Sequence, residues 1–280
     1  MPNKITLGKY FRRAQKEKWA LGQFNFSDFK ILEAIVSAAK EMRSPVILGT
    51  SEGESKSLGL NQTVALVRSF REETGLPLFL NLDHGKSFEY IKKAVDAGYD
   101  SVHFDGSGLS LAENIRETKK IREYADNFNV WVEGEIDVIG KASGSAGILT
   151  DPQQALAFIR ATRINSLAVS VGNLHGGQSS APNPNLNLKR LQEIKEKLKD
   201  WPLVLHGGSG VPDEDIEAAI KLGVIKININ TELRATFNKA LKEALKKPEI
   251  VPYKYMPKVV LKVQKVVAGK IKLFGSENKI

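Results

Sequence analysis

Three of the four histidines in the chain stand where they could bind one metal ion. His84, His175 and His206 each follow a short apolar run that we expect to be a strand. A catalytic zinc ion typically takes three protein ligands and leaves one position open, and imidazole ligands also suit cobalt or iron. The chain has no cysteine, which excludes thiolate ligands and thiol catalysis. One such histidine alone is typical of a surface or core residue, but three at equivalent strand ends indicate a metal site.

The remaining histidine, His103, lies inside an expected strand and shares one of its faces with Asp105, because side chains alternate along a strand. It either supports the metal ligands or is simply packed, and the sequence leaves both open. Polar residues also end, or directly follow, the other expected strands: Asn25, Thr50, Ser51, Asp83, Glu133, Glu135, Asn173, Asn228 and Asn230. Strand ends of this kind carry the chemistry in an α/β barrel.

Glycine-rich turns form a second group of candidate functional residues. Two glycines follow His175, and the segment HGGSG begins at His206. Farther along, NINT leads from Asn228 into a helical segment that opens at Thr231. Exposed backbone N–H groups and the positive end of a helix both favour an anion, and loops after strands seven and eight are a common phosphate site in barrels. We therefore expect a phosphate site, the alternative being that the glycines only make tight turns.

The elements that must position these residues alternate along the chain. Amphipathic stretches, such as Asp28 to Met42 and Phe88 to Ala97, separate eight β-branched or apolar runs. The runs span residues 20–24, 45–49, 77–82, 101–104, 130–135, 166–171, 202–205 and 224–229. This alternation implies parallel strands joined by crossover helices. Eight repeats predict a closed (β/α)8 TIM barrel, with an open doubly wound sheet as the alternative.

Chain length and helix boundaries agree with this interpretation. A barrel of this kind needs about 250 residues, so we expect residues 1–280 to form one domain with extra N- and C-terminal helices. Gly75, Gly98 and Gly223 each stand between a helical segment and a strand, where a helix end favours a residue able to adopt positive φ.

Charge and hydropathy narrow the classes of function. The net charge is +9, but the excess lysine lies in stretches such as KRLQEIKEKLKD, which resemble the solvated face of a helix. We therefore expect no nucleic-acid partner. No apolar run reaches the roughly 18 residues of a membrane span, and the N-terminal segment lacks the apolar core of a signal peptide. We expect a cytoplasmic protein with no membrane partner.

Taken in order, the motifs resemble those of the class II fructose-bisphosphate aldolases, including the tagatose-bisphosphate type. They are ALGQFNF, NLDHG, SVHFDGS, VEGEI, SLAVSVGNLHG, LVLHGGSG, KININTEL and KIKLFGS. The resemblance covers essentially the whole chain, and the order LDH, GNLHG, LHGGSG is specific. It implies reversible, metal-dependent aldol cleavage of a ketose phosphate, with fructose 1,6-bisphosphate as the leading substrate and dihydroxyacetone phosphate and glyceraldehyde 3-phosphate as products.

The resemblance also implies a role for each matching residue. The three histidines at strand ends match the ligands of catalytic zinc, and Asp83 matches the acid/base that exchanges a proton with the C4 oxygen. Asp105 and Glu135 match positions that bear on a second or alternative metal position. The same glycine-rich loops imply a monovalent cation, Na⁺ or K⁺. The positions that match substrate and phosphate groups are Asn25, Ser51, Gly176, Gly207, Ser209, Asn228, Asn230 and Thr231.

The chemistry of aldol cleavage agrees with these residue types. Cleavage leaves negative charge on an enediolate, which zinc stabilises as a Lewis acid. Asp83 beside His84 places a proton acceptor within reach of the breaking bond, and a phosphate loop orients the remote end of the substrate. The other aldolase strategy uses a Schiff-base lysine, for which Lys226 in the last expected strand is the candidate.

The loop after the fifth expected strand departs from the family pattern. It reads DVIGKASGSAGILTDP, with Lys141, Ser143 and Ser145 where acidic residues are expected. Asp137 and Asp151 are the nearest carboxylates, and the base that takes the enediolate proton is therefore not identified.

A second departure lies near the C-terminus, where the family commonly has an arginine that binds the second phosphate, often across a subunit interface. Here Tyr253 takes that place, and Lys254 beside it could act only as a point charge. We hypothesise from this that the aldehyde half of the substrate is unphosphorylated or differently charged.

Three alternatives stay open at this stage. The chain could act on tagatose bisphosphate or on a ketose 1-phosphate, or it could bind a sugar phosphate without turning it over. The resemblance also implies self-association, as a homodimer or a homotetramer.

Overall fold

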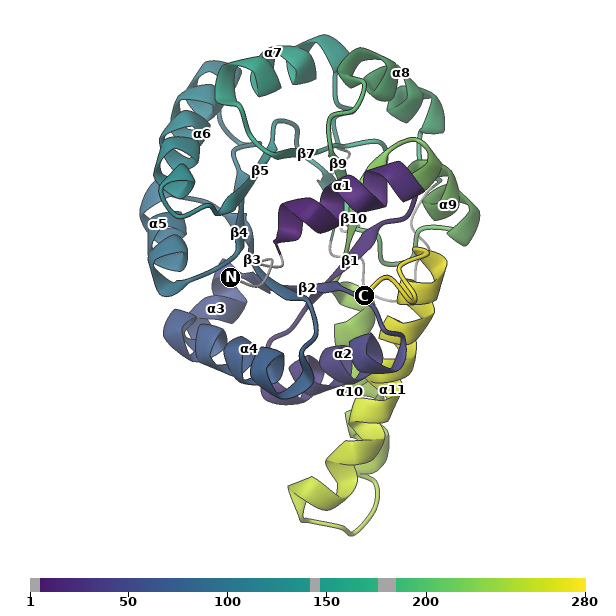
Figure 1. Cartoon of the computed structure of the whole chain (residues 1–280). Helices are drawn as coiled ribbons and strands as arrows, with labels where there is room; N and C mark the ends of the chain where they lie inside the picture. Colours follow the sequence, from purple (N-terminus) through teal and green to yellow (C-terminus); the bar gives the residue numbers. More distant parts are fainter. Residues whose placement is uncertain (1–5, 142–146, 176–184) are drawn as a thin grey trace.

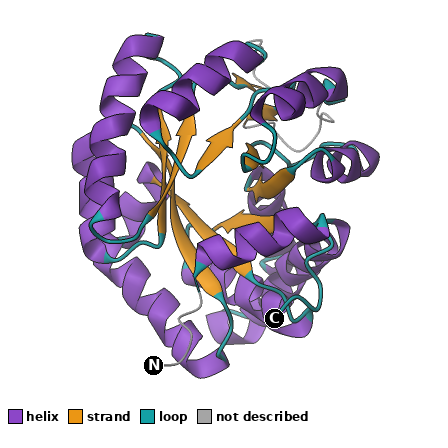
Figure 2. Ribbon diagram, turned by 45° about the horizontal axis from the view of Figure 1, so that its top comes forward, coloured by secondary structure: helices purple, strands orange, loops and turns teal. Residues whose placement is uncertain are grey.

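The structure of the protein, a computed structural model, describes residues 6–141, 147–175 and 185–280, with the backbone alone at Lys141 and His175. Eight parallel strands in these ranges close into a barrel in the order β1-β10-β9-β7-β5-β4-β3-β2 (Figures 1 and 2). They are β1 Leu21–Asn25, β2 Val46–Ser51, β3 Leu78–Gly85, β4 Ser101–Asp105, β5 Trp131–Glu135, β7 Ser166–Ala168, β9 Leu203–Leu205 and β10 Val224–Ile229. Each of the eight expected runs overlaps one of them. The TIM barrel is therefore confirmed, and the open sheet is wrong.

Helices surround the barrel on its outer side (Figure 1). They are α2 Phe29–Glu41, α3 Glu52–Leu58, α4 Leu60–Thr74, α5 Phe88–Ala97, α6 Leu111–Asp126, α7 Pro152–Thr162, α8 Leu188–Leu198, α9 Asp213–Lys221 and α10 Thr231–Ala244. Gly75, Gly98 and Gly223 have φ values of 67°, 104° and 99°, as expected at helix ends. With helices on one face and packed side chains on the other, strands such as β1 and β10 are buried along their whole length.

The inside of the barrel holds a layer of hydrogen-bonded polar side chains. Asn81 donates to Gln23 over 2.8 Å and accepts from Ser101 over 2.7 Å. All three side chains are buried, so each needs such a partner to offset the loss of water. This layer lies along β1, β3 and β4, below the polar strand ends.

Helix α1 Leu7–Glu17 covers the N-terminal end of the barrel. Its Phe11 packs edge-on against Trp131, with ring centroids 4.8 Å apart. Together with Leu7 and Ala14 it forms a small core against the first residues of several strands: Leu21, Ile47, Phe79 and Ile225. This end is thus filled by apolar contacts, and the opposite rim carries the polar residues.

The last two helices, α10 and α11 (Pro252–Leu273), extend beyond the ring of helices (Figure 1). Helix α11 packs on α2 and α10 through Val259, Val263, Val267 and Ile271, and the N-terminal half of α11 extends with the end of α10 beyond the barrel (Figure 1). A separate two-stranded ladder pairs β6 Gly140–Lys141 with β8 Leu174–His175. No helix in the described part of the chain is long and apolar enough to cross a membrane.

Candidate metal centre

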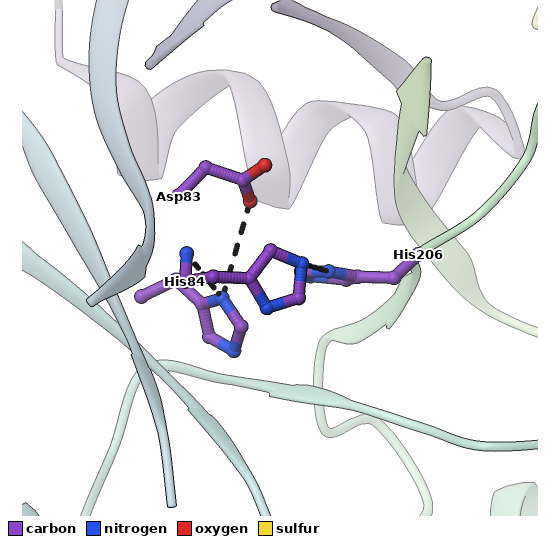
Figure 3. A group of neighbouring side chains, drawn as sticks. Asp83, His84 and His206 are labelled. Carbon is purple, nitrogen blue, oxygen red and sulfur yellow. Dashed lines mark hydrogen bonds and ion pairs between the residues drawn. The ribbon is translucent and has the colours of Figure 1, made fainter. Parts of the chain in front are cut away.

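Two of the expected metal ligands meet at the C-terminal rim of the barrel. His84 stands near the end of β3 and His206 directly follows β9. Their rings face each other, with His84 Nε2 and His206 Nδ1 3.1 Å apart (Figure 3). Asp83, His84, His103 and His206 each offer a ligand atom within 4.8 Å of the others. The barrel thus brings together residues from three strands of the sheet.

A carboxylate fixes the orientation of each of these two rings. His84 Nδ1 lies 3.0 Å from Asp105 Oδ2, and His206 Nε2 lies 2.7 Å from Glu133 Oε1. Because a carboxylate only accepts, both of these ring nitrogens carry the proton. The nitrogens left for a metal are His84 Nε2 and His206 Nδ1, the two that face each other. A carboxylate behind a metal-binding imidazole is the arrangement found in zinc sites.

The spacing of the two facing nitrogens fits a metal ion. A tetrahedral ion with Zn–N bonds of about 2.0 Å holds its ligand atoms about 3.3 Å apart, close to the 3.1 Å observed. Two lone pairs at this distance repel unless a cation lies between them. Burial alone would lower the pKa of His84, but the charge of Asp83 and the hydrogen bond with Asp105 raise that pKa to about 9. In the metal-free protein, a proton therefore occupies the place that a metal would take.

Asp83 is held as a charged carboxylate beside the two rings. Asn25 Nδ2 donates to its Oδ2 over 2.9 Å, and Asn228 Nδ2 donates to its Oδ1 over 3.0 Å. Burial would raise the pKa of Asp83, but the charges of His84, His206 and Lys226 hold it well below its usual range. Asp83 is thus a fixed, unprotonated acceptor at the metal centre.

Lys226, the candidate for a Schiff base, has another partner. It is 2% exposed, and its Nζ forms an ion pair with Glu133 Oε2 over 2.7 Å. Glu133 in turn accepts from His206. The lysine therefore neutralises the carboxylate that orients His206, and this arrangement favours the metal mechanism.

Asp105 and Glu135 lie beside His84, with all three ligand atoms within 4.8 Å of one another. Asp105 bonds to His84, Lys86 and the Ser107 hydroxyl. Burial, reinforced by the charge of Asp105, raises the pKa of Glu135 well above its usual range. Together with His84, both residues therefore form a second group that could hold a metal ion.

A cavity of about 280 Å³ opens beside the two ring nitrogens. Besides Asp83 and His84, it is lined by most of the expected substrate and phosphate residues: Ser51, Gly207, Ser209, Asn228, Asn230 and Thr231. Ser209 Oγ accepts from the backbone N–H of Glu232 over 3.3 Å, which ties the HGGSG loop to the N-terminus of α10. This arrangement offers an anion both a glycine-rich loop and a helix N-terminus.

Two side chains that bond to each other were not anticipated from the sequence: Arg234, which lines this cavity, and Glu54 beside it. Glu54 is buried and accepts from Asn25, Arg234 and the backbone N–H of Ser51. Ser51 caps α3, and Glu54 completes its capping box. Arg234 lines the cavity and is 53% exposed. The spacing of Arg234, one helical turn after Thr231, was the signal that could have identified it.

Several expected site residues fall outside the described part of the chain. Gly176, Ser143 and Ser145 lie in the undescribed segments, as do the side chains of His175 and Lys141. Of the two remaining loop carboxylates, Asp151 is the N-cap of α7, and burial raises the pKa of Asp137. Neither of these two carboxylates is among the described residues that line the cavity.

A larger groove, of about 710 Å³, lies between α10 and α11. Lysine is the commonest residue of its lining, with Tyr255 and Glu249 among the other members, and the lining includes none of the strand-end residues. Tyr253 lies near this groove, 74% exposed, and not at the cavity beside the histidines. Size alone would therefore have placed the site wrongly.

Comparison with known proteins shows the family to which this chain belongs. The family profile described as "Fructose-bisphosphate aldolase class-II" matches residues 5–279. The chain is 37% identical to a fructose-bisphosphate aldolase of Geobacillus stearothermophilus and 38% identical to a probable fructose-bisphosphate aldolase of Bacillus subtilis, with 98% of each chain covered. Among solved structures, the YdjI aldolase of Escherichia coli superposes with a TM-score of 0.84 at 32% identity, covering 97% of each chain.

Proposed function

Since this chain belongs to the class-II fructose-bisphosphate aldolase family, we propose that it cleaves fructose 1,6-bisphosphate reversibly to dihydroxyacetone phosphate and glyceraldehyde 3-phosphate. Enzymes of this class perform metal-dependent aldol cleavage of sugar phosphates. The observation that carries the proposal is the pair of facing nitrogens, His84 Nε2 and His206 Nδ1, 3.1 Å apart beside the charged Asp83.

His84 and His206 would hold the divalent metal through these nitrogens, and we propose His175 as the third ligand and zinc as the ion. Zinc bound there would act as a Lewis acid on the substrate carbonyl, stabilising the negative charge that cleavage leaves. Asp105 and Glu133 keep the two rings in the tautomers that binding requires. Glu135 and Asp105 would serve an alternative metal position.

Asp83 would take the proton from the C4 hydroxyl during cleavage and return it during condensation. Asn25 and Asn228 hold its two oxygens in place. The phosphate of the dihydroxyacetone half would bind at Gly207, Ser209 and the N-terminus of α10, with Asn230 and Thr231 beside it. The same loop, with Gly176, would hold a monovalent cation, Na⁺ or K⁺.

Arg234 supports a substrate with a second phosphate. Arg234 lines the cavity, where it pairs with Glu54, and its guanidinium is suited to bidentate phosphate binding. This weighs against the hypothesis, drawn from Tyr253, of an unphosphorylated aldehyde half. A substrate panel tests the point: we expect cleavage of fructose 1,6-bisphosphate in preference to tagatose 1,6-bisphosphate and fructose 1-phosphate. Binding without single-turnover cleavage of any of them would instead favour the non-catalytic alternative.

The variant Arg234→Met sharpens this test. Loss of a charge-assisted bond of about 1.5–3 kcal/mol should raise KM for the bisphosphate roughly 10- to 100-fold and leave fructose 1-phosphate cleavage unchanged. Arg68→Met, at an exposed position of α4, is the matched control. An equal loss on both substrates would show that Arg234 does not bind the second phosphate. We also propose that the enzyme works in the cytoplasm as a homo-oligomer.

A further inference from the structure

His103 has no part in the proposed chemistry, although it lies at the centre of the site. It stands in β4 with its side chain fully buried. Its ring centroid lies 4.8 Å from that of His84 and 4.6 Å from that of His206. By position alone it could be a fourth metal ligand, a support for the ligands or a packed residue, and its hydrogen bonds distinguish these roles.

One ring nitrogen of His103 accepts a hydrogen bond from the backbone of His84. The backbone N–H of His84 donates to His103 Nδ1 over 3.1 Å. An amide N–H only donates, so Nδ1 must offer its lone pair and the ring proton must be on Nε2. Neither nitrogen of neutral His103 is then available to a metal. His84 and His206 differ in this respect. In each of them a carboxylate accepts from the ring N–H, and the other nitrogen keeps its lone pair toward the proposed metal position.

The backbone that His103 contacts is in an unusual conformation. His84 has a φ of 53°, in the left-handed region that residues other than glycine adopt only at an energetic cost. The backbone N–H of His84 donates to a buried ring, and this hydrogen bond stabilises the conformation. The bend in turn decides where the imidazole of His84 points.

The other nitrogen of His103 faces Glu135. Nε2 lies 3.3 Å from Glu135 Oε2, and both side chains are almost completely buried. Within the described residues, neither atom has a hydrogen-bond partner. The two atoms are close enough for an ion-pair contact but are not aligned as a hydrogen bond, so His103 packs directly against this carboxylate.

We propose that His103 is a positioning residue of the metal centre and not a ligand: it fixes the bent backbone of His84 on one side and the Glu135 carboxylate on the other. This inference rests on the proposed function, because it takes His84 to be a metal ligand. It also resolves the two interpretations of His103 that the sequence leaves open, in favour of support for the ligands.

Nuclear magnetic resonance on the intact protein tests the proposal directly. The protein is loaded with NMR-active cadmium and carries isotopically labelled histidine nitrogens. We expect metal–nitrogen coupling at His84 Nε2 and His206 Nδ1, none at His103, and the Nε2–H tautomer for His103. Coupling at His103, or a proton on its Nδ1, would overturn the inference. Absence of coupling at His84 and His206 would refute the proposed metal centre itself.

Three substitutions separate positioning from packing. In His103→Asn the amide oxygen stands near the place of Nδ1, in His103→Gln an amide stands near the place of Nε2, and His103→Leu retains neither. We expect the metal dissociation constant, measured by competition with a coloured chelator, to stay within about threefold in His103→Asn. It should rise at least tenfold in His103→Gln and His103→Leu. The visible spectrum of the cobalt-loaded protein should change only in the last two.

Ser101→Ala is the matched control, because Ser101 lies in the same strand on the same face and bonds only within the polar layer. It should keep wild-type affinity and spectrum. Wild-type values for His103→Leu would show that His103 is merely packed. A greater loss in His103→Asn than in His103→Gln would show that Nε2 is a ligand. If a variant does not fold, the coupling experiment on the unaltered protein still decides.

Discussion

At the residue scale, the centre is specified by which nitrogen of each imidazole carries the proton. Asp105 and Glu133 hold His84 and His206 with the two nitrogens proposed to bind the metal facing each other. His103 instead accepts a hydrogen bond from a backbone N–H. Lys226 supplies the positive charge that balances Glu133 in the buried interior. Removing any of these partners should weaken metal binding before it changes the fold.

Asp105→Ala tests the support of His84. Without the carboxylate, the ring of His84 loses its orientation and some basicity, so we expect metal affinity to fall roughly 10- to 100-fold. Asp105→Asn keeps an acceptor oxygen and should recover most of this loss. Asp96→Ala removes a surface carboxylate that pairs with Lys92 and serves as the control. Unchanged affinity in Asp105→Ala would contradict the role given to this hydrogen bond.

Metal affinity should depend on pH. His84 must lose its proton before Nε2 can bind a metal, and its pKa of about 9 lies above the usual value of roughly 6.5. Affinity should therefore rise about tenfold per pH unit up to about pH 9 and then level off. In the metal-free protein, the raised pKa of His84 stabilises the fold. This stabilisation is fully present below about pH 6.5 and is lost as the pH rises through about 9. The metal affinity would be measured by chelator competition across this pH range. An affinity that does not change with pH would contradict the prediction.

Residues could be predicted from the sequence where their type and their position at a strand end both indicate a function. The pair Asp83 and His84 at a strand end, and His206 before its glycines, are where they were expected. The role of Glu133 was not recoverable, because it depends on contacts with residues 73 and 93 positions away. The tautomer of His103 likewise depends on a backbone donor in the neighbouring strand.

At the element scale, the site is built from strand ends and from the turns that follow them. The HGGSG turn is packed tightly: the backbone N–H of Gly208 donates to Asn228 O over 3.0 Å. A Cβ at this position would lie 2.6 Å from Ile227 and 3.2 Å from the carbonyl of Asn228. Glycine is thus required here by close approach of β10 to the turn.

Gly208→Ala should therefore disturb the phosphate site. We expect a loss of about 1–3 kcal/mol in the free energy of unfolding from overpacking, and a higher KM for the sugar phosphate as the loop shifts. Gly108→Ala, in a rim loop with no atom within 4 Å of the added Cβ, is the control. The two would be measured by denaturant unfolding and by steady-state kinetics. Equal behaviour of both variants would show that the turn tolerates a side chain.

The long repeating elements could be predicted, and the short ones could not. Eight apolar runs separated by amphipathic stretches gave the barrel, because burial on both faces leaves a clear pattern. The ladder of β6 and β8 has two residues in each strand, too few for any periodicity. Helix α3 begins immediately after β2 without a loop. Its N-cap, Ser51, is also the last residue of the strand, so the sequence contains no separate signal for the start of the helix.

At the scale of the whole molecule, one end of the barrel is filled and the other carries the chemistry. Helix α1 fills the N-terminal end with aromatic contacts, and the hairpin of α10 and α11 extends from the side (Figure 1). The far end of this hairpin exposes large apolar side chains: Leu245 at 56%, Ile250 at 88% and Tyr253 at 74%. Apolar groups exposed together at one place are typical of an interaction surface.

We expect this surface to contribute to self-association. The double variant Ile250→Lys and Tyr253→Lys should shift the protein toward monomers in sedimentation analysis, because it places charge on the apolar end of the hairpin. Leu109→Lys, at a 42% exposed position of the rim, should leave the assembly unchanged. A wild-type protein that is monomeric at all concentrations, or a double variant with unaltered assembly, would contradict this expectation.

Exhaustive removal of metal, followed by titration with zinc, tests the metal mechanism most directly. Activity on fructose 1,6-bisphosphate should fall to background in the stripped protein and return fully at about one zinc ion per chain, the number that three histidine ligands with one open position would hold. Borohydride added with substrate should not inactivate the enzyme, because Lys226 is engaged with Glu133. Full activity in the metal-free protein, together with inactivation by borohydride, would contradict the mechanism.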